Sequence, residues 1–455
     1  MRGKHDAKCF LRHVFLFEWG GSEMEKLFHL AENGTTVRRE VSAGVTTFFA
    51  MAYIIFVNPV FLSAAGMDPA GVMIATCLGA AAGSVLCAAI SNLPYAMAPG
   101  MGLNTFFAFT LCGSAMYAYR WQQALALTFI AGGLFLLITL TPLRDRIIAA
   151  VPANLQHAIA AGIGLFIALI GLLNAGLIVM TDGFPALGDL RSPQALLTVF
   201  GVAVTAVLMV LKVPAPLLLG MAATVAAGLL SGQVQPPEKI VSLPGALSEV
   251  FCKLDFHGLV RGGAGGVVGL AALLFSMTMV DMFDTLGFLI GAGSQTGEGT
   301  LSPRAGEVLT ADALATVLGA VCGTSTVTTY AESAAGVSAG GRTGLTSLVT
   351  AAGFLLALFF SPLAELFTAA AAAPALIMVG MFLTADVRKV DFSRTDEAIP
   401  AFLTILLIPL SYSITTGIGA GFIAWAVCKA VGRSRRELSP MAAVLAGVFA
   451  LYFIL

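Results

Sequence analysis

Apolar runs of about twenty residues recur along the chain from about residue 41 to its end, separated by short polar or Gly/Pro-containing segments. Each run is close to the length that an α-helix needs to cross a bilayer. The pattern predicts fourteen membrane spans, near residues 41–64, 69–91, 97–115, 121–141, 155–179, 194–212, 214–231, 265–291, 304–322, 330–340, 343–361, 365–385, 397–413 and 416–432. A last apolar stretch, 439–455, is short for a full span, and its role stays open.

Two of these spans do not read as continuous helices. The third contains "MAPGMGLNTFFAF", with Pro99 and Gly100 shortly before Asn104, and the tenth lies in "GTSTVTTYAESAAGVSAGG", which is small and polar around Glu332. Irregular backbone at membrane depth persists only where protein surrounds it or a cavity borders it. Interrupted spans at matching places in two halves point to the binding site of an inverted-repeat transporter. We therefore expect two inverted seven-span repeats, although no direct sequence repetition is visible.

The predicted organisation has five parts. These are a cytoplasmic N-terminal tail (1–37), a first repeat (38–232), an outer loop (233–262), a second repeat (263–432) and a C-terminal tail (433–455). With the N-terminus inside, the predicted cytoplasmic loops hold most of the Lys and Arg residues, and the outer loops hold only Arg120, Arg191, Lys239, Lys253 and Arg261. This bias agrees with the positive-inside rule and places both ends of the main bundle in the cytoplasm.

Composition supports a membrane protein and excludes several other classes. Of the 455 residues, 58% are hydrophobic and 11% are charged, against about 25% charged in soluble domains. The net charge of −1 gives no sign of a nucleic-acid partner. The scattered cysteines form no metal-ligand pattern, so neither a metal nor another cofactor is expected. The "GVSAG" segment has no downstream His, so a membrane enzyme with a nucleophile elbow is disfavoured.

Intramembrane acids are the candidate functional residues. Asp281 and Asp284 lie three residues apart in the eighth span, about 60° apart around a helix, and share one face. Two close carboxyl groups in a low dielectric do not both ionise at low cost, so one of them is expected to hold a proton. Glu332 is suited to a flat ligand with adjacent N–H donors, and Asn104 can both donate and accept hydrogen bonds. The competing interpretations are helix-packing contacts for the two aspartates, a water-facing position at a span end for Glu332, and a helix cap for Asn104.

Five segments resemble one known family: "AGVTTFFAMAYIIFVNP", "APGMGLNTFFA", "VDMFDTLGFLIG", "GTSTVTTYAESAAGVSAGGRTGLT" and "EAIPAFLTILLIPLSYSI". The sequence is similar to the AzgA-type purine permeases of the nucleobase/ascorbate transporter superfamily. The resemblance implies an all-α protein of two inverted seven-span repeats, a core domain (spans 1–4 and 8–11) moving against a gate domain, and extended segments in spans 3 and 10. It also implies proton symport of adenine, guanine and hypoxanthine across the plasma (inner) membrane, and it is compatible with a homodimer.

By motif, the resemblance assigns the substrate site to Asp281, Asp284, Glu332 and Asn104, and leaves open which aspartate contacts the base and which takes the proton. Wider relatives carry a polar residue where this chain has Phe288, so Phe288 is expected to form an apolar wall of the site. The alternatives are a pyrimidine or xanthine/urate permease, or an anion exchanger or channel on the same scaffold. Anion transport would favour Lys or Arg in spans 3, 8 and 10, which have none.

Overall fold

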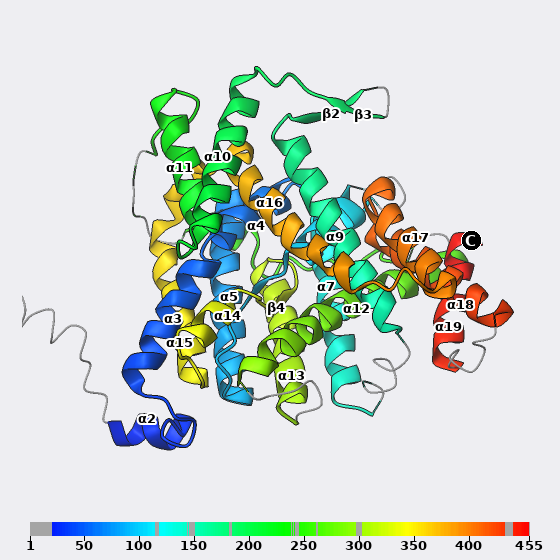
Figure 1. Ribbon diagram of the computed structural model, residues 1–455, viewed down its shortest axis with the longest axis horizontal. Coiled ribbons are helices and arrows are strands. Elements are labelled where there is room, and N and C mark those ends of the chain that lie inside the picture. Colours follow the sequence, from blue (N-terminus) through cyan, green and yellow to red (C-terminus); the bar gives the residue numbers. More distant parts are fainter. Residues whose placement is uncertain are drawn as a thin grey trace, which may run out of the picture.

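In the computed structural model, helices account for most of the chain (Figure 1). The structure describes residues 21–113, 118–142, 144, 151–181, 184–237, 239, 241, 245–260, 263–296, 303–432 and 440–454. Within these residues, nine helices are long and apolar enough to cross a membrane. Together with shorter apolar helices at Met101–Cys112, Pro216–Leu230 and Gly344–Phe360, with helix α17 and with the segment around strand β4, they make up the fourteen predicted spans.

The first half of the chain contains α2 (Gly21–Phe28), α3 (Val37–Met51), α4 (Ile54–Ser63), α5 (Pro69–Ser91), β1 (Met97–Pro99), α6 (Met101–Thr105) with a π-helix at Phe106–Cys112, α7 (Trp121–Thr139), α9 (Ala153–Asn174), the hairpin β2 (Ile178–Thr181) and β3 (Phe184–Leu187), α10 (Pro193–Val210) and α11 (Pro216–Leu230). The first predicted span is therefore two helices, α3 and α4, with a break at Ala52 and Tyr53.

The second half contains a 3₁₀ helix (Ala246–Glu249), α12 (Gly263–Thr296), α13 (Pro303–Cys322), β4 (Val327–Thr329), α14 (Ser333–Ser338), α15 (Gly344–Ala357), a 3₁₀ helix (Leu358–Leu366), α16 (Ala369–Thr384), a 3₁₀ helix (Ala385–Lys389), α17 (Thr395–Ser411), α18 (Ile414–Val431) and α19 (Pro440–Ile454). The predicted repeat and tail boundaries stay predictions, and most of the predicted N-terminal tail lies outside the described residues.

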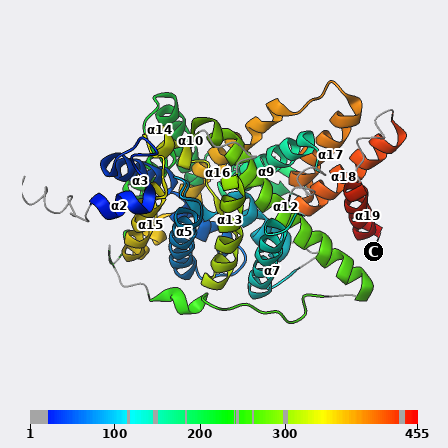
Figure 2. The same ribbon diagram turned by 90° about the horizontal axis from the view of Figure 1, so that it is seen from below.

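Helices from the two halves interleave to form two packed groups. In the core domain α5 packs on α13 and α15, α7 packs on α13, and α3 packs on α15. In the gate domain α9 packs on α16 and α17, α10 packs on α16, and α18 packs on α17. In Figure 2, α3, α15 and α5 lie toward one end of the molecule, α13 lies near the middle, and α17 and α18 lie toward the other end. This arrangement is the predicted fold of two inverted repeats divided into core and gate domains.

The two interrupted spans meet at the centre of the core domain. Strands β1 and β4 pair antiparallel, with Met97 opposite Thr329, Ala98 opposite Thr328, and Pro99 opposite Val327. In Figure 1, β4 lies in the middle of the molecule. Because lipid offers no hydrogen bonds, this pairing supplies partners to backbone groups that a broken helix leaves free. The predicted extended segments in spans 3 and 10 are thus confirmed, and they are bound to each other.

Small residues on the neighbouring helices give the paired strands room. A Cβ atom added to Gly319 of α13 would lie 2.6 Å from Cγ2 of Val327 and 2.9 Å from the carbonyl oxygen of Ser325. A Cβ atom on Gly83 of α5 would lie 2.9 Å from Cβ of Met97. These separations are shorter than van der Waals contact, so a side chain at either position would displace the strands.

A buried acid ties the first span to the eleventh. Glu40 of α3 is fully buried, and its carboxylate accepts hydrogen bonds from the backbone N–H groups of Arg342, Thr343 and Thr346 and from two hydroxyl groups. These N–H groups belong to the first turn of α15 and the residues before it, where a carboxylate replaces missing helical partners. The contact holds the end of the segment that follows Glu332.

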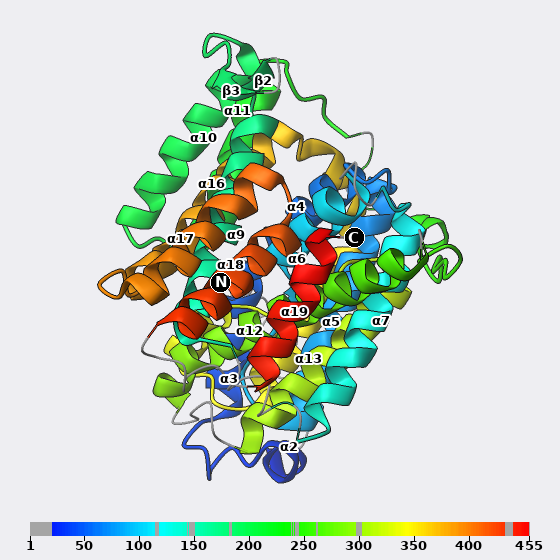
Figure 3. The same ribbon diagram turned by 90° about the vertical axis from the view of Figure 1, so that its right-hand side faces the viewer.

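The last apolar stretch, whose role the sequence leaves open, is a helix that contacts both domains. In Figure 3, α19 runs beside α18 and α12. Phe449 of α19 is fully buried, with its ring centroid 5.8 Å from that of Phe422 on α18 and 5.9 Å from that of Phe275 on α12. The helix therefore packs as part of the protein interior and joins gate helix α18 to core helix α12.

The tight packing at Gly319 leads to a stability prediction. We expect Gly319→Val to destabilise the protein by about 1–3 kcal/mol, because the added side chain collides with Val327 and with backbone. The matched control is Gly133→Val on α7, where an added Cβ meets no atom within 4 Å. Thermal unfolding in detergent measures both variants, and equal melting temperatures would contradict the prediction.

Candidate functional site

The β1–β4 pair brings the two short helices of the core domain to one place. Gly100, just before α6, donates its N–H to the carbonyl oxygen of Thr326 at 3.0 Å, and Tyr330, just before α14, donates its N–H to that of Ala96 at 3.0 Å. The Tyr330 hydroxyl also donates to the carbonyl oxygen of Pro99 at 2.7 Å. The candidate residues Asn104 and Glu332 each follow one of these strands, so pairing of the strands sets their positions.

Glu332 lies at the start of α14 and is half-buried. Its Oε1 accepts a hydrogen bond from the hydroxyl of Tyr53 at 2.7 Å. Tyr53 comes from the break between α3 and α4, a residue that sequence reasoning missed. The candidate acid of the second half is thus held by a side chain of the first half.

Asn104 of α6 is fully buried. Its Oδ1 accepts a hydrogen bond from the hydroxyl of Ser325 in the second half. Its Nδ2 has no hydrogen-bond partner within the part of the chain that the structure describes. A buried donor without a partner costs free energy, which a ligand carrying an acceptor would recover.

The two aspartates of α12 differ in their surroundings. Asp281 is 2% exposed, and its Oδ2 accepts a hydrogen bond from Thr316 of α13 at 2.9 Å. Asp284 is half-buried, and a Cβ atom on Gly102 of α6 would lie 3.7 Å from its Oδ2. Asp281 therefore faces packed protein on α13, whereas Asp284 keeps an accessible surface beside the start of α6.

A third core-domain aspartate joins this group and was missed by the sequence analysis. Asp312 of α13 is fully buried, and its Oδ2 accepts hydrogen bonds from Thr285, next to Asp284, and from Thr328 of β4 at 3.2 Å. Its Oδ1, like that of Asp281, has no partner among the described residues. The available signal was an acid inside the apolar run "LTADALATVLGA" of the ninth span.

None of these acids has a cationic partner among the ion pairs of the described residues. The one buried lysine or arginine in the described residues is Lys429, on gate helix α18, which pairs with Asp396 and Glu397. Buried carboxylates without cations are costly, so protons or ligand donors must balance the negative charge. No cluster of metal-binding side chains occurs in the part of the chain that the structure describes.

Phe288 lies one helical turn beyond Asp284 on α12 and is half-buried. Its ring meets that of Tyr95 edge to face, with centroids 4.9 Å apart and planes at 89°. Phe288 also packs against a buried apolar cluster that includes Leu289 and Met97. The structure thus gives Phe288 an aromatic partner just before β1, and its role as a wall of the site stays a prediction.

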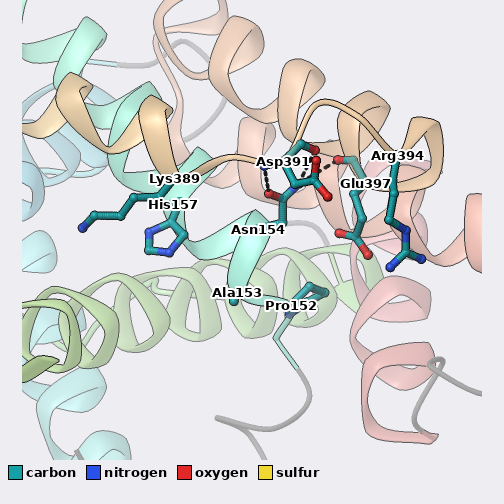
Figure 4. Close-up of a pocket in the computed structure, with 8 residues that line it drawn as sticks. All are labelled: Pro152, Ala153, Asn154, His157, Lys389, Asp391, Arg394 and Glu397. Carbon is teal, nitrogen blue, oxygen red and sulfur yellow. Dashed lines mark hydrogen bonds between the residues drawn. The ribbon is translucent and has the colours of Figure 1, made fainter.

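A separate pocket lies at the end of the gate domain where α9 and α17 begin (Figure 4). It encloses about 360 Å³ and is lined by Pro152, Ala153, Asn154, His157, Lys389, Asp391, Arg394 and Glu397. Asn154 accepts a hydrogen bond from the N–H of Asp391 at 2.6 Å and donates to the carbonyl oxygen of Glu397 at 3.1 Å. His157 contacts Asp386 at 3.2 Å. These bonds join the ends of gate helices, and the pocket contains none of the intramembrane candidates.

The fold of two interleaved groups of helices is similar to that of solved membrane proteins. The transmembrane domain of a cyanobacterial bicarbonate transporter, BicA, has a similar fold, with a TM-score of 0.63, 16% identity, and coverage of 83% of this chain and 96% of that chain. The inward-facing structure of the murine anion transporter Slc26a9 is also similar, with a TM-score of 0.61, 9% identity, and coverage of 86% of this chain and 68% of that chain. At these identities the likeness concerns the fold alone.

Sequence comparisons identify the family. Residues 38–420 match the model described as "Permease family". The chain is 42% identical over 430 residues to the guanine/hypoxanthine permease PbuO of Bacillus subtilis, covering 93% of this chain and 98% of that protein. It is 41% identical over 437 residues to the adenine permease AdeP of Escherichia coli, covering 95% of this chain and 96% of that protein. The chain belongs to this permease family and is a multi-pass membrane transporter, not an enzyme, which confirms the family resemblance of its motifs.

The buried cation of the gate domain leads to a second stability prediction. Lys429 is 0% exposed and lies 2.7 Å from Oδ2 of Asp396 and 2.6 Å from Oε1 of Glu397. We expect Lys429→Met to cost about 3–5 kcal/mol, because it leaves Glu397 without its cation and Asp396 with only its pair to Arg394. Lys389→Met is the control, since Lys389 is 60% exposed in its pair with Asp386 and such pairs contribute about 0–1 kcal/mol. Similar losses of thermal stability in both variants would refute the prediction.

Proposed function

We propose that this permease takes up purine nucleobases, namely adenine, guanine and hypoxanthine, by proton symport. Uptake proceeds by alternating access as the core domain moves against the gate domain. Support comes from relatives named guanine/hypoxanthine permease and adenine permease, which match almost the whole chain. We place the protein in the plasma (inner) membrane with both ends of the main bundle in the cytoplasm, as the Lys/Arg distribution favours.

The observation that carries this proposal is a set of half-buried and buried polar groups around the β1–β4 pair. Glu332 and Asp284 are acceptors with accessible surface, and Asn104 has a buried amide without a partner among the described residues. A purine base carries N–H donors and ring-nitrogen or carbonyl acceptors on one flat edge. Carboxylates pair with the donors, and the free amide of Asn104 pairs with an acceptor.

We assign different roles to the two aspartates. Asp284, which is half-buried beside α6, contacts the base. Asp281, which is packed against Thr316 and has one oxygen without a partner among the described residues, takes the coupling proton. Asp312 lies close enough to Asp281 to interact electrostatically, so a proton on either carboxyl relieves repulsion for both.

Anion exchange is a weaker candidate for this site. The charged groups that we assign to the site are carboxyls, and α6, α12, β4 and α14 have no Lys or Arg in their sequences. An anion at this place would meet repulsion without a compensating cation. The likeness to the bicarbonate transporter is therefore limited to the fold, and the proposed ligand is an uncharged heterocycle.

Uptake measurements test the function itself. We expect expression in a host deficient in purine uptake to raise accumulation of radiolabelled hypoxanthine or adenine, and a protonophore to abolish that accumulation. A competition panel of all common nucleobases separates purines from pyrimidines, xanthine and urate. Unchanged uptake of every purine would refute the proposal, and accumulation that survives the protonophore but requires sodium would replace the proton by sodium.

Paired variants test the roles of the aspartates. We expect Asp284→Asn to weaken base binding at least tenfold, because it removes the charged acceptor to which an N–H group of the base donates. We expect Asp281→Asn to retain binding and base exchange but to lose accumulation, because it removes the group that takes the proton. Binding assays on purified protein and exchange assays in vesicles distinguish the two effects. Loss of binding in Asp281→Asn with normal binding in Asp284→Asn would reverse the assignment.

A further inference from the structure

Tyr53 is a polar residue at an otherwise apolar place in the first span. The surrounding sequence is "FAMAYIIF", and the residue lies where α3 ends and α4 begins. Its side chain is 1% exposed, so its hydroxyl has no access to bulk water. A buried phenol requires a hydrogen-bond partner, and this partner is Oε1 of Glu332, at 2.7 Å and 279 positions later in the chain.

The contact affects Glu332 more than it affects Tyr53. A glutamate side chain has three rotatable torsions, and fixing them costs free energy on binding unless another group has already restrained them. Glu332 is only half-buried, so packing restrains it less than it restrains Tyr53. The hydroxyl of Tyr53 occupies one position on the carboxylate and thereby orients the remaining acceptor positions.

Neighbouring groups keep Tyr53 in place. Its ring centroid lies 6.5 Å from that of Tyr330, whose hydroxyl is bonded to the carbonyl oxygen of Pro99 in β1. Tyr330 also lies within electrostatic range of both Glu332 and Asp284. The two tyrosines therefore connect the first span, the strand pair and the proposed base-binding acids.

We propose that Tyr53 is a positioning and specificity-determining residue of the base site, acting through Glu332. This inference rests on the proposed function, in which Glu332 accepts hydrogen bonds from the N–H groups of the base. By donating to Oε1, Tyr53 holds the carboxylate in one orientation and removes one acceptor position. The site then favours ligands whose adjacent N–H groups match the positions that remain.

The test is Tyr53→Phe, which keeps the ring and removes only the hydroxyl. Hydrogen bonds to charged groups contribute about 1.5–3 kcal/mol, and this one acts on the ligand indirectly. We therefore expect KM for hypoxanthine to rise about tenfold, with kcat changed by less than twofold. In the competition panel, the spread of inhibition constants among purines with different N–H arrangements is expected to narrow.

A matched control separates this role from general loss of a buried hydrogen bond. Tyr119 is also buried, and its hydroxyl donates to the carbonyl oxygen of Leu259 at 2.7 Å, far in sequence from the acids. Tyr119→Phe is expected to lower thermal stability without changing KM or the inhibition pattern. Equal changes of KM in the two variants would overturn the proposed role of Tyr53.

Infrared difference spectroscopy gives a readout that does not depend on which substrate is carried. The carboxyl band of Glu332, assigned with Glu332→Gln, is expected to shift in Tyr53→Phe and to remain in place in Tyr119→Phe. An unmoved band in Tyr53→Phe would overturn the inference. Failure of the wild-type protein to take up any purine would instead refute the proposed function, while the band shift would still decide whether Tyr53 controls Glu332.

Discussion

The antiparallel pairing of β1 with β4 is the contact on which the remaining structure depends. At membrane depth, a chain that leaves the helical conformation must find other partners for its N–H and carbonyl groups. Two broken spans solve this problem for each other, with three facing residue pairs and flanking bonds from Gly100 and Tyr330. The strand pair requires small residues on α5 and α13, because larger side chains there would separate the strands from these helices. The central position of the short helices α6 and α14 follows as well.

This pairing also explains why the proposed site belongs to neither half of the chain. Asn104 accepts from Ser325, Glu332 accepts from Tyr53, and Asp281 accepts from Thr316. The first two contacts join a group of one half to a group of the other. A displacement of one half relative to the other would therefore change the polar groups that face a ligand. Both contacts lie within the core domain, so they fix the polar groups of the proposed site inside that domain.

Much of this architecture could be predicted from the chain, and the reasons are local. Apolar runs of membrane length mark the spans, and Pro99, Gly100 and the small polar run before Glu332 mark the two interruptions. The acids Asp281, Asp284 and Glu332 are conspicuous because a charge inside an apolar span is costly. Asp312 is also an acid inside an apolar span. It was not singled out, because the rest of that span has the pattern of an ordinary helix. Tyr53 carried no such signal, because an isolated tyrosine in an apolar helix is common.

The sequence by itself determined which segments enter the membrane, where two of them break and which rare acids lie inside, since hydropathy and chain length act on each segment separately. The tertiary structure alone decided how those acids differ. Asp281 is buried and accepts a hydrogen bond from Thr316, whereas Asp284 keeps accessible surface. Glu332 accepts a hydrogen bond from a tyrosine 279 positions earlier. Burial and hydrogen bonding depend on neighbours that are distant along the chain. These neighbours come together only when the helices of both halves have packed.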